Sequence, residues 1–321
     1  MNLKGKVVIM EKNANILICI NKKFLMPAIV MLESLFQNND IKITVYVFQS
    51  DFSKTDESKL VNYVDNWGKK NDKKVHIIKI DNSIFDEINT TNEMRWPKEV
   101  FYRLLASVIL PKHIKKILYL DADIIIDKSI MVFYNMGFYG KALIACEDGY
   151  VTSQNTYSKR LNIPDPYSYF NSGVLLFNLE LLRVYLKLEK VLDNINTNSK
   201  NIIFPDQDLL NSMLYDKVLI CDFRKYNFMC DSSRYTRKYF RNHVKNAAIF
   251  HFGGGNNFKP WHYKYAGKLS YLWWKYAKYT EYRVRYKEFK IRNKLYKSYH
   301  WILVVFKVIR NIFKYKVLKM Q

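Results

Sequence analysis

Apolar runs typical of buried strands alternate with helical apolar spacings along the first 258 residues. Strands are predicted at 16–20, 42–48, 75–80, 117–120, 142–146, 174–179, 218–221 and 247–250, and helices at 26–36, 53–70, 97–110, 181–195 and 206–214. Pro27 suits the first turn of its helix, and Ser53 suits the N-cap position of the next one. Strands that alternate with helices predict an α/β fold, with a mostly parallel central sheet and helices on both faces.

Polar residues follow two of the predicted strands. Asn21 comes after the strand 16–20, and Asp121 and Asp123 come after the strand 117–120. Ligands bind such sheets at the carboxyl ends of the strands. The spacing of the two carboxylates is weak evidence, because Asp206 and Asp208 repeat it and a solvated turn or a helix cap would also explain it. However, two charges inside an apolar stretch are costly unless something neutralises them, and a divalent metal is the simplest such partner.

A histidine and three glycines follow the last predicted strand. His251 could ligate a metal of the Mn²⁺ type, whereas an imidazole on Mg²⁺ would be unusual. The glycines, Gly254 among them, allow a backbone to approach a phosphate closely, and Lys259 offers a point charge to a diphosphate. Taken alone, His251 could be an ordinary strand-end histidine and the glycines a loop. Together with the acidic pair they favour a metal–diphosphate site.

Composition and charge narrow the class of protein. An apolar content of 49% is too high for a disordered chain. The four cysteines form no C-x-x-C pair, which argues against a zinc ribbon or a disulfide-dense module. The net charge is +23, and residues 259–321 alone hold 17 Lys or Arg against two Glu, interleaved with 17 aromatic residues. Such a block predicts a polyanionic partner, either anionic lipid or nucleic acid.

The C-terminal segment has the pattern of an interfacial helix. Apolar residues fall on one face, with basic residues beside it, at Trp301, Ile302, Val305, Phe306, Ile309, Ile312 and Phe313. No apolar run is long enough to span a bilayer, and the N-terminal residues lack the apolar core of a secretory signal. We therefore expect a cytoplasmic protein, peripheral on the inner face of the plasma membrane and bound to its anionic surface. Binding of single-stranded nucleic acid, or packing of the helix on the rest of the protein, are the alternatives.

Six segments, in order, carry a resemblance to a known family. They are Phe101-Tyr102-Arg103-Leu104, the stretch 116–123 that ends in Asp121-Ala122-Asp123, the stretch 169–178 around Asn171-Ser172-Gly173, the stretch 205–211 with Asp206-Gln207-Asp208, Tyr226-Asn227-Phe228, and His251-Phe252-Gly253 through Lys259-Pro260-Trp261. Over residues 15–262 the sequence resembles glycosyltransferase family 8, which includes bacterial lipopolysaccharide galactosyl- and glucosyltransferases and glycogenin.

The resemblance implies a fold and an activity. The fold is a GT-A-type, Rossmann-like domain for nucleotide sugars over residues 1–266, followed by a basic aromatic tail over 267–321. The activity is a metal-dependent, retaining hexosyl transfer. Glucose or galactose would move from UDP-glucose or UDP-galactose to a glycan or lipid-linked saccharide acceptor in cell-surface polysaccharide synthesis. Nucleic acid is then not an expected partner.

The resemblance also implies roles for individual residues. The ligands of Mn²⁺, or alternatively Mg²⁺, would be Asp121, Asp123 and His251. The donor would be bound by Asn21, Arg103, Asp121, Ala122, Asp123, Asn171, Gly254 and Lys259. The groups at the reacting sugar would be Gln207, Asp206 and Asp148. Two departures concern the nucleotide end, because Asn21 stands where the family usually has an aspartate that reads the uracil, and Lys23 stands where a small amide is common.

Two other functions remain open from the residues alone. A sugar-phosphate nucleotidylyltransferase also combines a Rossmann-like fold with acidic metal ligands. It would be expected to carry a glycine-rich phosphate loop near the N-terminus, and residues 16–24 contain no glycine. A non-catalytic module that binds nucleic acid would instead show salt-dependent binding of oligonucleotides without binding UDP.

Overall fold

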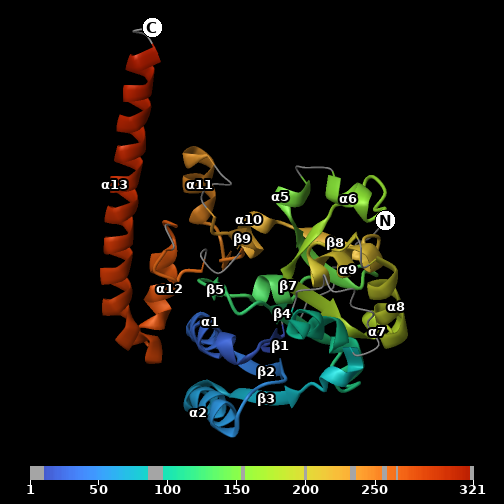
Figure 1. Ribbon diagram of the computed structural model, residues 1–321. Coiled ribbons are helices and arrows are strands. Elements are labelled where there is room, and N and C mark those ends of the chain that lie inside the picture. Colours follow the sequence, from blue (N-terminus) through green and yellow to red (C-terminus); the bar gives the residue numbers. More distant parts are fainter. Residues whose placement is uncertain are drawn as a thin grey trace, which may run out of the picture. The chain divides into compact units, whose positions relative to one another are not determined.

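The computed structural model describes residues 11–85, 97–152, 156–198, 201–231, 236–254, 259–264 and 267–318 (Figure 1). The chain divides into two compact units. The first comprises Met1–Phe228 with Thr236–His251, and the second comprises Met229–Tyr235 with Phe252–Gln321. The division between the units falls after His251, whereas the sequence places the start of the tail at residue 267.

A seven-stranded sheet forms the centre of the first unit (Figure 1). Its strands are β1 (Asn13–Cys19), β2 (Lys42–Gln49), β3 (Lys73–Lys79), β4 (Lys116–Leu120), β6 (Leu143–Glu147), β7 (Phe170–Asn178) and β8 (Val218–Cys221). They lie in the order β3-β2-β1-β4-β7-β6-β8. Strand β7 runs antiparallel to both of its neighbours, and the other neighbouring strands are parallel. The predicted α/β fold with a mostly parallel sheet is confirmed.

Helices connect these strands. The described helices of the first unit are η1 (Lys22–Phe24), α1 (Leu25–Gln37), α2 (Lys54–Asn71), η2 (Asn82–Phe85), η3 (Lys98–Leu105), α3 (Ala106–Ile109), α4 (Met131–Tyr134), α5 (Gly149–Thr152), α6 (Thr156–Arg160), α7 (Leu179–Tyr185), α8 (Leu188–Asn198), α9 (Pro205–Leu214), α10 (Phe223–Tyr226) and α11 (Arg237–Val244). Ser53 caps α2 through a reciprocal pair of bonds with Asp56, as its sequence position predicts.

Two apolar cores lie on opposite faces of this sheet. Successive side chains of a strand point to opposite faces. Ile16 and Ile18 of β1 therefore pack in a core with α1, and Leu17 between them packs in a second core with residues of η3 and α9. Burial on both faces explains why the strand reads as a continuous apolar run.

The reversal of β7 decides what lies at the functional edge of the sheet. Leu120, at the end of β4, pairs with Val174 near the beginning of β7. The backbone N–H of Asp121 then donates to the carbonyl of Gly173 at 2.9 Å. As a result, the beginning of β7 lies beside the carboxyl ends of its antiparallel neighbours β4 and β6, and Asn171 reaches the same edge as Asp121.

A small second sheet places a histidine at this edge. It has the order β5-β10-β9, with β5 at Ile124–Ile126, β10 at Ile249–His251 and β9 at Phe228–Met229. Strand β5 begins three residues after Asp121, and His251 pairs with Ile124 in the antiparallel register. The pairing brings a residue from late in the chain beside the acidic turn.

Two predicted helices differ from the structure. The segment 97–110 forms the 3-10 helix η3 and the single α-turn α3, and the segment 181–195 is divided into α7 and α8. Leu186 interrupts the second segment, because its backbone leaves the helical region (φ −102°, ψ 64°) while its side chain is buried. Tertiary packing overrides helical spacing at both places.

In the second unit, helices surround an aromatic core. Its helices are α12 (Ser270–Ala277), η7 (Glu281–Arg285) and α13 (Tyr286–Leu318). Trp273 is fully buried and lies edge-on against Trp274 and Tyr282. Aromatic residues therefore act here as core, with preferred edge-to-face geometry. Across the described residues, no helix combines the length and the apolar character needed to cross a membrane.

Candidate metal and donor site

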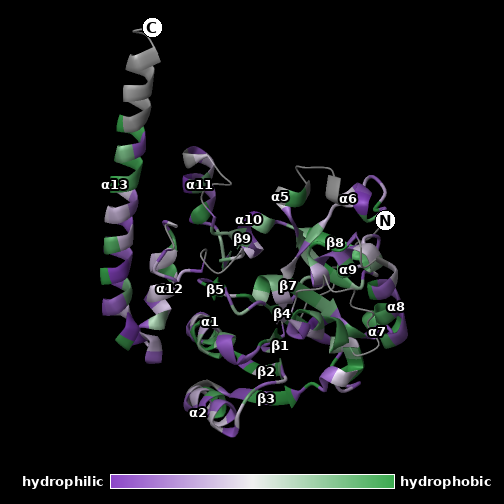
Figure 2. Ribbon diagram, viewed as in Figure 1, coloured by the Kyte–Doolittle hydropathy of each residue, from purple (hydrophilic) through white to green (hydrophobic). Residues whose placement is uncertain are grey.

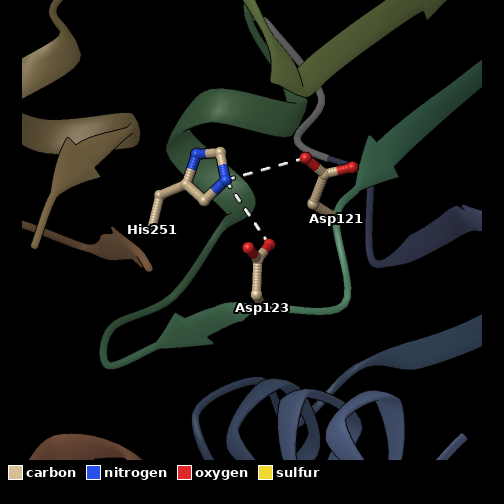
Figure 3. A group of neighbouring side chains, drawn as sticks. All are labelled: Asp121, Asp123 and His251. Carbon is tan, nitrogen blue, oxygen red and sulfur yellow. Dashed lines mark ion pairs between the residues drawn. The ribbon is translucent and has the colours of Figure 1, made fainter. Parts of the chain in front are cut away.

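Two carboxylates and one imidazole converge where β4 gives way to β5 (Figure 3). The chain leaves β4 at Leu120, turns at Ala122 and enters β5 at Ile124, so that Asp121 and Asp123 stand on either side of the turn. The Nε2 atom of His251 lies 3.6 Å from Asp121 Oδ2 and 3.4 Å from Asp123 Oδ1. One ligand atom from each residue lies within 4.8 Å of the others.

The donor set of this cluster suits a divalent cation. Asp123 and His251 are only 7% and 4% exposed, so few water molecules can screen their charge. Two carboxylate oxygens with one imidazole nitrogen are ligand atoms that divalent metal ions bind. The predicted convergence of Asp121, Asp123 and His251 on one candidate metal site is thus supported by the geometry.

Arg103, in the last turn of η3, pairs with two acidic side chains at this edge, Asp121 and Asp206. Its guanidinium lies 3.1 Å from Asp121 Oδ1 and 3.0 Å from Asp206 Oδ2. Its Nη1 also donates to the carbonyl oxygen of Ser172 at 2.9 Å, and its face stacks on the ring of Tyr119 at 4.3 Å. The residue therefore joins η3, β4, β7 and α9 at one point.

Burial and neighbouring charges alter the acidity of these groups. Burial alone would lower the pKa of Arg103, but the carboxylates of Asp121 and Asp206 raise it above its ordinary value. Burial raises the pKa of Asp206, although Arg103 opposes this effect. Burial also raises the pKa of Tyr119, whose hydroxyl donates to Asp121 Oδ1 at 2.5 Å. Tyr119 is thus a neutral hydrogen-bond donor to the metal-ligand carboxylate.

A group of amides lies beside the acidic cluster. Asn171 Nδ2 donates to Gln207 Oε1 at 3.0 Å and to Asp148 Oδ2 at 3.2 Å. Gln207 Nε2 donates to the same Asp148 oxygen at 3.2 Å. Asn171 lies in β7, Gln207 in the first turn of α9, and Asp148 directly after β6. The structure thus brings together the residues that the resemblance assigns to the sugar pocket.

The second Asp-x-Asp pair divides between two roles. Residues two apart on a helix do not face the same side. Asp206 faces Arg103, whereas the fully buried Asp208 lies 3.0 Å from Arg160 Nη2 and accepts the hydroxyl of Tyr169 at 2.6 Å. Asp208 Oδ2 also accepts the backbone N–H of Phe204 at 2.9 Å. Asp208 therefore anchors the beginning of α9.

The remaining predicted donor residues have different surroundings. Asn21 follows β1 at the same edge, where its side-chain oxygen accepts the backbone N–H of Lys23 at 3.1 Å and caps η1. Gly254 has a φ of +106°, a conformation that favours glycine. Lys259 is buried and donates to the carbonyl of Phe252 at 3.0 Å. Gly254 and Lys259 belong to the second unit, and Gly255 of the predicted glycine loop lies outside the described residues.

The segment of Lys259 is held by the helices that follow it. Trp274 Nε1 donates to the carbonyl of Pro260 at 3.2 Å, and Asn293 Nδ2 donates to the carbonyl of Tyr263 at 2.6 Å. The ring of Tyr263 then meets Tyr296 of α13 edge-on. Residues of α12 and of the first half of α13 therefore support this segment.

Comparison with known families decides the classification. The model of glycosyl transferase family 8 matches residues 15–265 of the chain. The chain belongs to glycosyl transferase family 8. The resemblance predicted from the six sequence segments is thereby confirmed.

Curated relatives of this family 8 chain include several bacterial glycosyltransferases. The lipopolysaccharide glucosyltransferase WaaO of Escherichia coli K12 is 27% identical over 75% of the chain and 70% of its own length. A putative glycosyltransferase of Haemophilus influenzae is 28% identical over 73% of the chain and 69% of its own length. The general stress protein A of Bacillus subtilis is 26% identical over 58% of the chain, and the match spans 66% of that relative.

Solved structures share the family 8 fold. The galactosyltransferase LgtC, crystallised with donor and acceptor sugar analogues, has a TM-score of 0.70 at 22% identity, over 83% of this chain and 96% of that one. The glycosyltransferase GlyE of Streptococcus pneumoniae has a TM-score of 0.62 at 17% identity, over 86% of this chain and 63% of that one. At these identities the likeness concerns the fold, which is the GT-A type that the sequence predicts.

Three further residues at the site of this family 8 chain were not assigned from the sequence. Gly173 lies against the metal ligands, because a Cβ atom there would stand 2.3 Å from His251 Cε1 and 2.8 Å from Asp121 Oδ2. The side-chain oxygen of Asn227 lies within hydrogen-bond distance of His251 Nδ1, at 2.9 Å. The hydroxyl of Tyr119 donates a hydrogen bond to Asp121 Oδ1. Tyr119, Gly173 and Asn227 all lie in segments that carry the family resemblance, which was the available signal.

We expect Gly173→Ala to disrupt the metal site while the fold persists. The new methyl group must displace His251 or Asp121, and disturbing the orientation of metal ligands typically costs about 10–100-fold in metal affinity. Gly149→Ala is the matched control, since the nearest atom to its Cβ would be Phe223 Cζ at an ordinary 3.9 Å. Mn²⁺ affinity and thermal unfolding should be measured for both variants. Unchanged Mn²⁺ affinity in Gly173→Ala would contradict the role assigned to this glycine.

Proposed function

We propose that this chain is a metal-dependent, retaining hexosyltransferase that acts in cell-surface polysaccharide synthesis. It would move glucose or galactose from a UDP-sugar to a glycan or lipid-linked saccharide acceptor. The observation that carries the proposal is the cluster of Asp121, Asp123 and His251 beside the amides of Asn171 and Gln207, in a family 8 chain. This arrangement provides one place for a metal-bound diphosphate and, next to it, hydrogen-bonding groups for a sugar.

The named activities of the relatives support the choice of substrates. They include lipopolysaccharide 1,2-glucosyltransferases of Escherichia coli and the lipopolysaccharide 1,3-galactosyltransferase of Salmonella typhimurium. Those proteins divide between glucose and galactose, so both UDP-sugars are donors to test. The same family membership favours a glycosyltransferase over a sugar-phosphate nucleotidylyltransferase.

The chain's own residues would stabilise the departing UDP. Asp121, Asp123 and His251 would hold Mn²⁺, with Mg²⁺ as the alternative. When bound, the ion supplies Lewis-acid stabilisation of the charge that develops on the diphosphate. Lys259 would add a positive charge toward the same diphosphate, which is electrostatic stabilisation of the leaving group. Arg103 holds Asp121 and Asp206 in place, and so fixes the acidic edge before the donor binds.

The bonding of Gln207 favours transfer without a covalent enzyme intermediate. Its Oε1 already accepts the backbone N–H of Ser172 at 3.1 Å and the amide of Asn171 at 3.0 Å. An amide oxygen with both lone pairs engaged is a poor nucleophile. The acceptor hydroxyl would therefore attack the anomeric carbon on the face that UDP leaves, and a phosphate oxygen of UDP would take its proton. Asp206 and Asp148 would position hydroxyl groups or stabilise positive charge on the sugar.

The first prediction concerns the metal. UDP-glucose and UDP-galactose should be hydrolysed slowly in the presence of Mn²⁺, and Asp123→Asn should reduce this rate by at least about 10²–10³-fold, because a preorganised charge-stabilising group is lost. Glu180→Gln removes an exposed carboxylate and should leave the rate unchanged. Release of glucose or galactose should be followed at several Mn²⁺ concentrations. Wild-type activity of Asp123→Asn across that range would refute the metal assignment.

The second prediction concerns the configuration of the product. Attack from the leaving-group face should convert an α-linked UDP-sugar into an α-linked glycoside. Proton NMR of the anomeric signal of the product measures this directly. A β-linked product would exclude the retaining mechanism.

We also propose that the enzyme is cytoplasmic and binds the anionic inner face of the plasma membrane through α13. Large apolar side chains are exposed there, with Trp301 and Phe306 at 67% and 66%. Residues 301–309 form the mainly green part of α13, beyond its more purple first half (Figure 2). Exposed neighbours such as Leu303 and Val308 extend the apolar surface beyond the single face expected from the sequence. Side chains beyond Ile309, including the predicted Ile312 and Phe313, lie outside the described set.

Such a segment suits the interface of a bilayer. Its apolar side chains can enter the acyl boundary, while the preceding Lys and Arg residues attract anionic head groups by about 1 kcal/mol each. A soluble UDP-sugar and a lipid-linked acceptor would then meet at the same surface. Residues 267–300 should be kept in any truncation, because Trp274 and Asn293 support the segment of Lys259.

The third prediction is that removal of residues 301–321 releases the protein from anionic vesicles and preserves hydrolysis of the UDP-sugar. High salt should weaken, but not abolish, binding of the full chain. The double variant Trp301→Glu/Phe306→Glu should behave like the truncation, and Val184→Glu, which changes an exposed valine of α7, is its control. Vesicle sedimentation measures binding. Equal binding of the full and truncated chains would contradict the membrane proposal.

A further inference from the structure

Two backbone amides fix the orientation of the side-chain amides at the site. A backbone N–H can only donate. Gly173 N–H lies 2.9 Å from Asn171 Oδ1, so this atom must be the amide oxygen, and Asn171 Nδ2 must face Gln207 and Asp148. Ser172 N–H likewise identifies Gln207 Oε1 as the acceptor at 3.1 Å. Assignments that usually have to be chosen from a network are determined here by the main chain.

Asn227 connects these side-chain amides to the imidazole of His251. The side chain of Asn227 lies 2.7 Å from Asn171 Oδ1, an acceptor, so its Nδ2 must point there. Its oxygen is then directed at His251 Nδ1, 2.9 Å away. Because an amide oxygen only accepts, Nδ1 of His251 must carry the proton. In the neutral imidazole this leaves the lone pair on Nε2, which faces Asp121 and Asp123.

We propose that Asn227 is a positioning residue that fixes His251 as its Nδ1–H tautomer and couples this metal ligand to the amide pocket. The inference rests on the metal centre of the proposed function. Asn227 is 2% exposed, so no bulk water replaces it. Without its oxygen, the proton of His251 would move to Nε2 and be donated to the neighbouring carboxylates. That arrangement occupies the groups that would bind the cation.

The network also connects the metal ligand to the sugar side of the site. Asn171 Oδ1 accepts from both Asn227 and Gly173, and its Nδ2 donates to Gln207 and Asp148. Asn227 therefore has two separable functions. Its oxygen orients His251, and its NH₂ group orients Asn171.

Two variants separate these functions. Asn227→Ala removes both, and we expect the Kd for Mn²⁺ to rise about 10–100-fold, as for other groups that orient metal-binding histidines. Asn227→Asp keeps an acceptor for His251 but loses the donor to Asn171. It should retain Mn²⁺ affinity while raising the KM for the UDP-sugar. Asn39→Ala is the stability control, because Asn39 is equally buried and bonds Leu35 and Ile130 instead.

The decisive readout does not depend on catalysis. Long-range ¹H–¹⁵N spectra at pH 8, with the His251 signals identified by His251→Gln, report which ring nitrogen carries the proton. The wild-type chain and Asn227→Asp should show the Nδ1–H form, and Asn227→Ala the Nε2–H form. Electron paramagnetic resonance gives the Kd for free Mn²⁺ in the same samples.

The outcomes distinguish this inference from the proposed function. An Nδ1–H tautomer and a Kd within about twofold of wild type in folded Asn227→Ala would overturn the role of Asn227. If Asn227→Ala does not fold, Asn227→Asp is the test. An Nε2–H tautomer of His251 in Asn227→Asp would equally refute the role of Asn227. A wild-type chain that binds no Mn²⁺, but whose tautomer changes in Asn227→Ala, would contradict the metal centre and support the orientation of His251.

Discussion

A buried guanidinium holds the acidic edge of the central sheet together. Arg103 pairs with Asp121 and Asp206, stacks on Tyr119 and donates to the main chain of β7. Removing a single charge from water is costly unless it is paired and hydrogen-bonded, and these contacts supply both. Asp123 adds a third carboxyl group to this edge, 3.4 Å from His251 Nε2. The edge therefore has an excess of acidic groups, which is the electrostatic basis for binding a divalent cation there.

The reversed strand β7 gives this edge its second component. An all-parallel sheet would place only strand ends and loops at the site. Because β7 enters the sheet from this side, its first residues bring ordered backbone amides beside Asp121. Gly173 permits the close approach to His251, and the N–H groups of Ser172 and Gly173 orient the side-chain amides. A rigid main chain thus preorganises a polar pocket that side chains alone would leave adjustable.

The second unit combines two kinds of aromatic residue. Those of α12 and η7, such as Trp273 and Tyr282, form a buried core, whereas Trp301 and Phe306 of α13 are exposed. An edge-on contact between the rings of Tyr263 and Tyr296 links the segment of Lys259 to α13. A basic aromatic composition therefore has two physical meanings within one stretch of chain: packing near its beginning and an exposed apolar surface farther along.

The sequence by itself determined the α/β fold, the succession of strands and helices along the chain, and the residue types of the metal cluster. These features depend on local signals. Continuous apolar runs indicate strands that are buried on both faces, and charged residues stand at the end of one such strand. Only the tertiary structure decided that Asp206 and Asp208 have opposite roles, that Gly173 must lack a side chain, and that Asn227 orients His251. Each of these depends on contacts between residues tens of positions apart, such as the 56-residue separation of Asn227 from Asn171. Periodicity and spacing describe only neighbours along the chain, so they cannot specify which distant groups a reversed strand brings together.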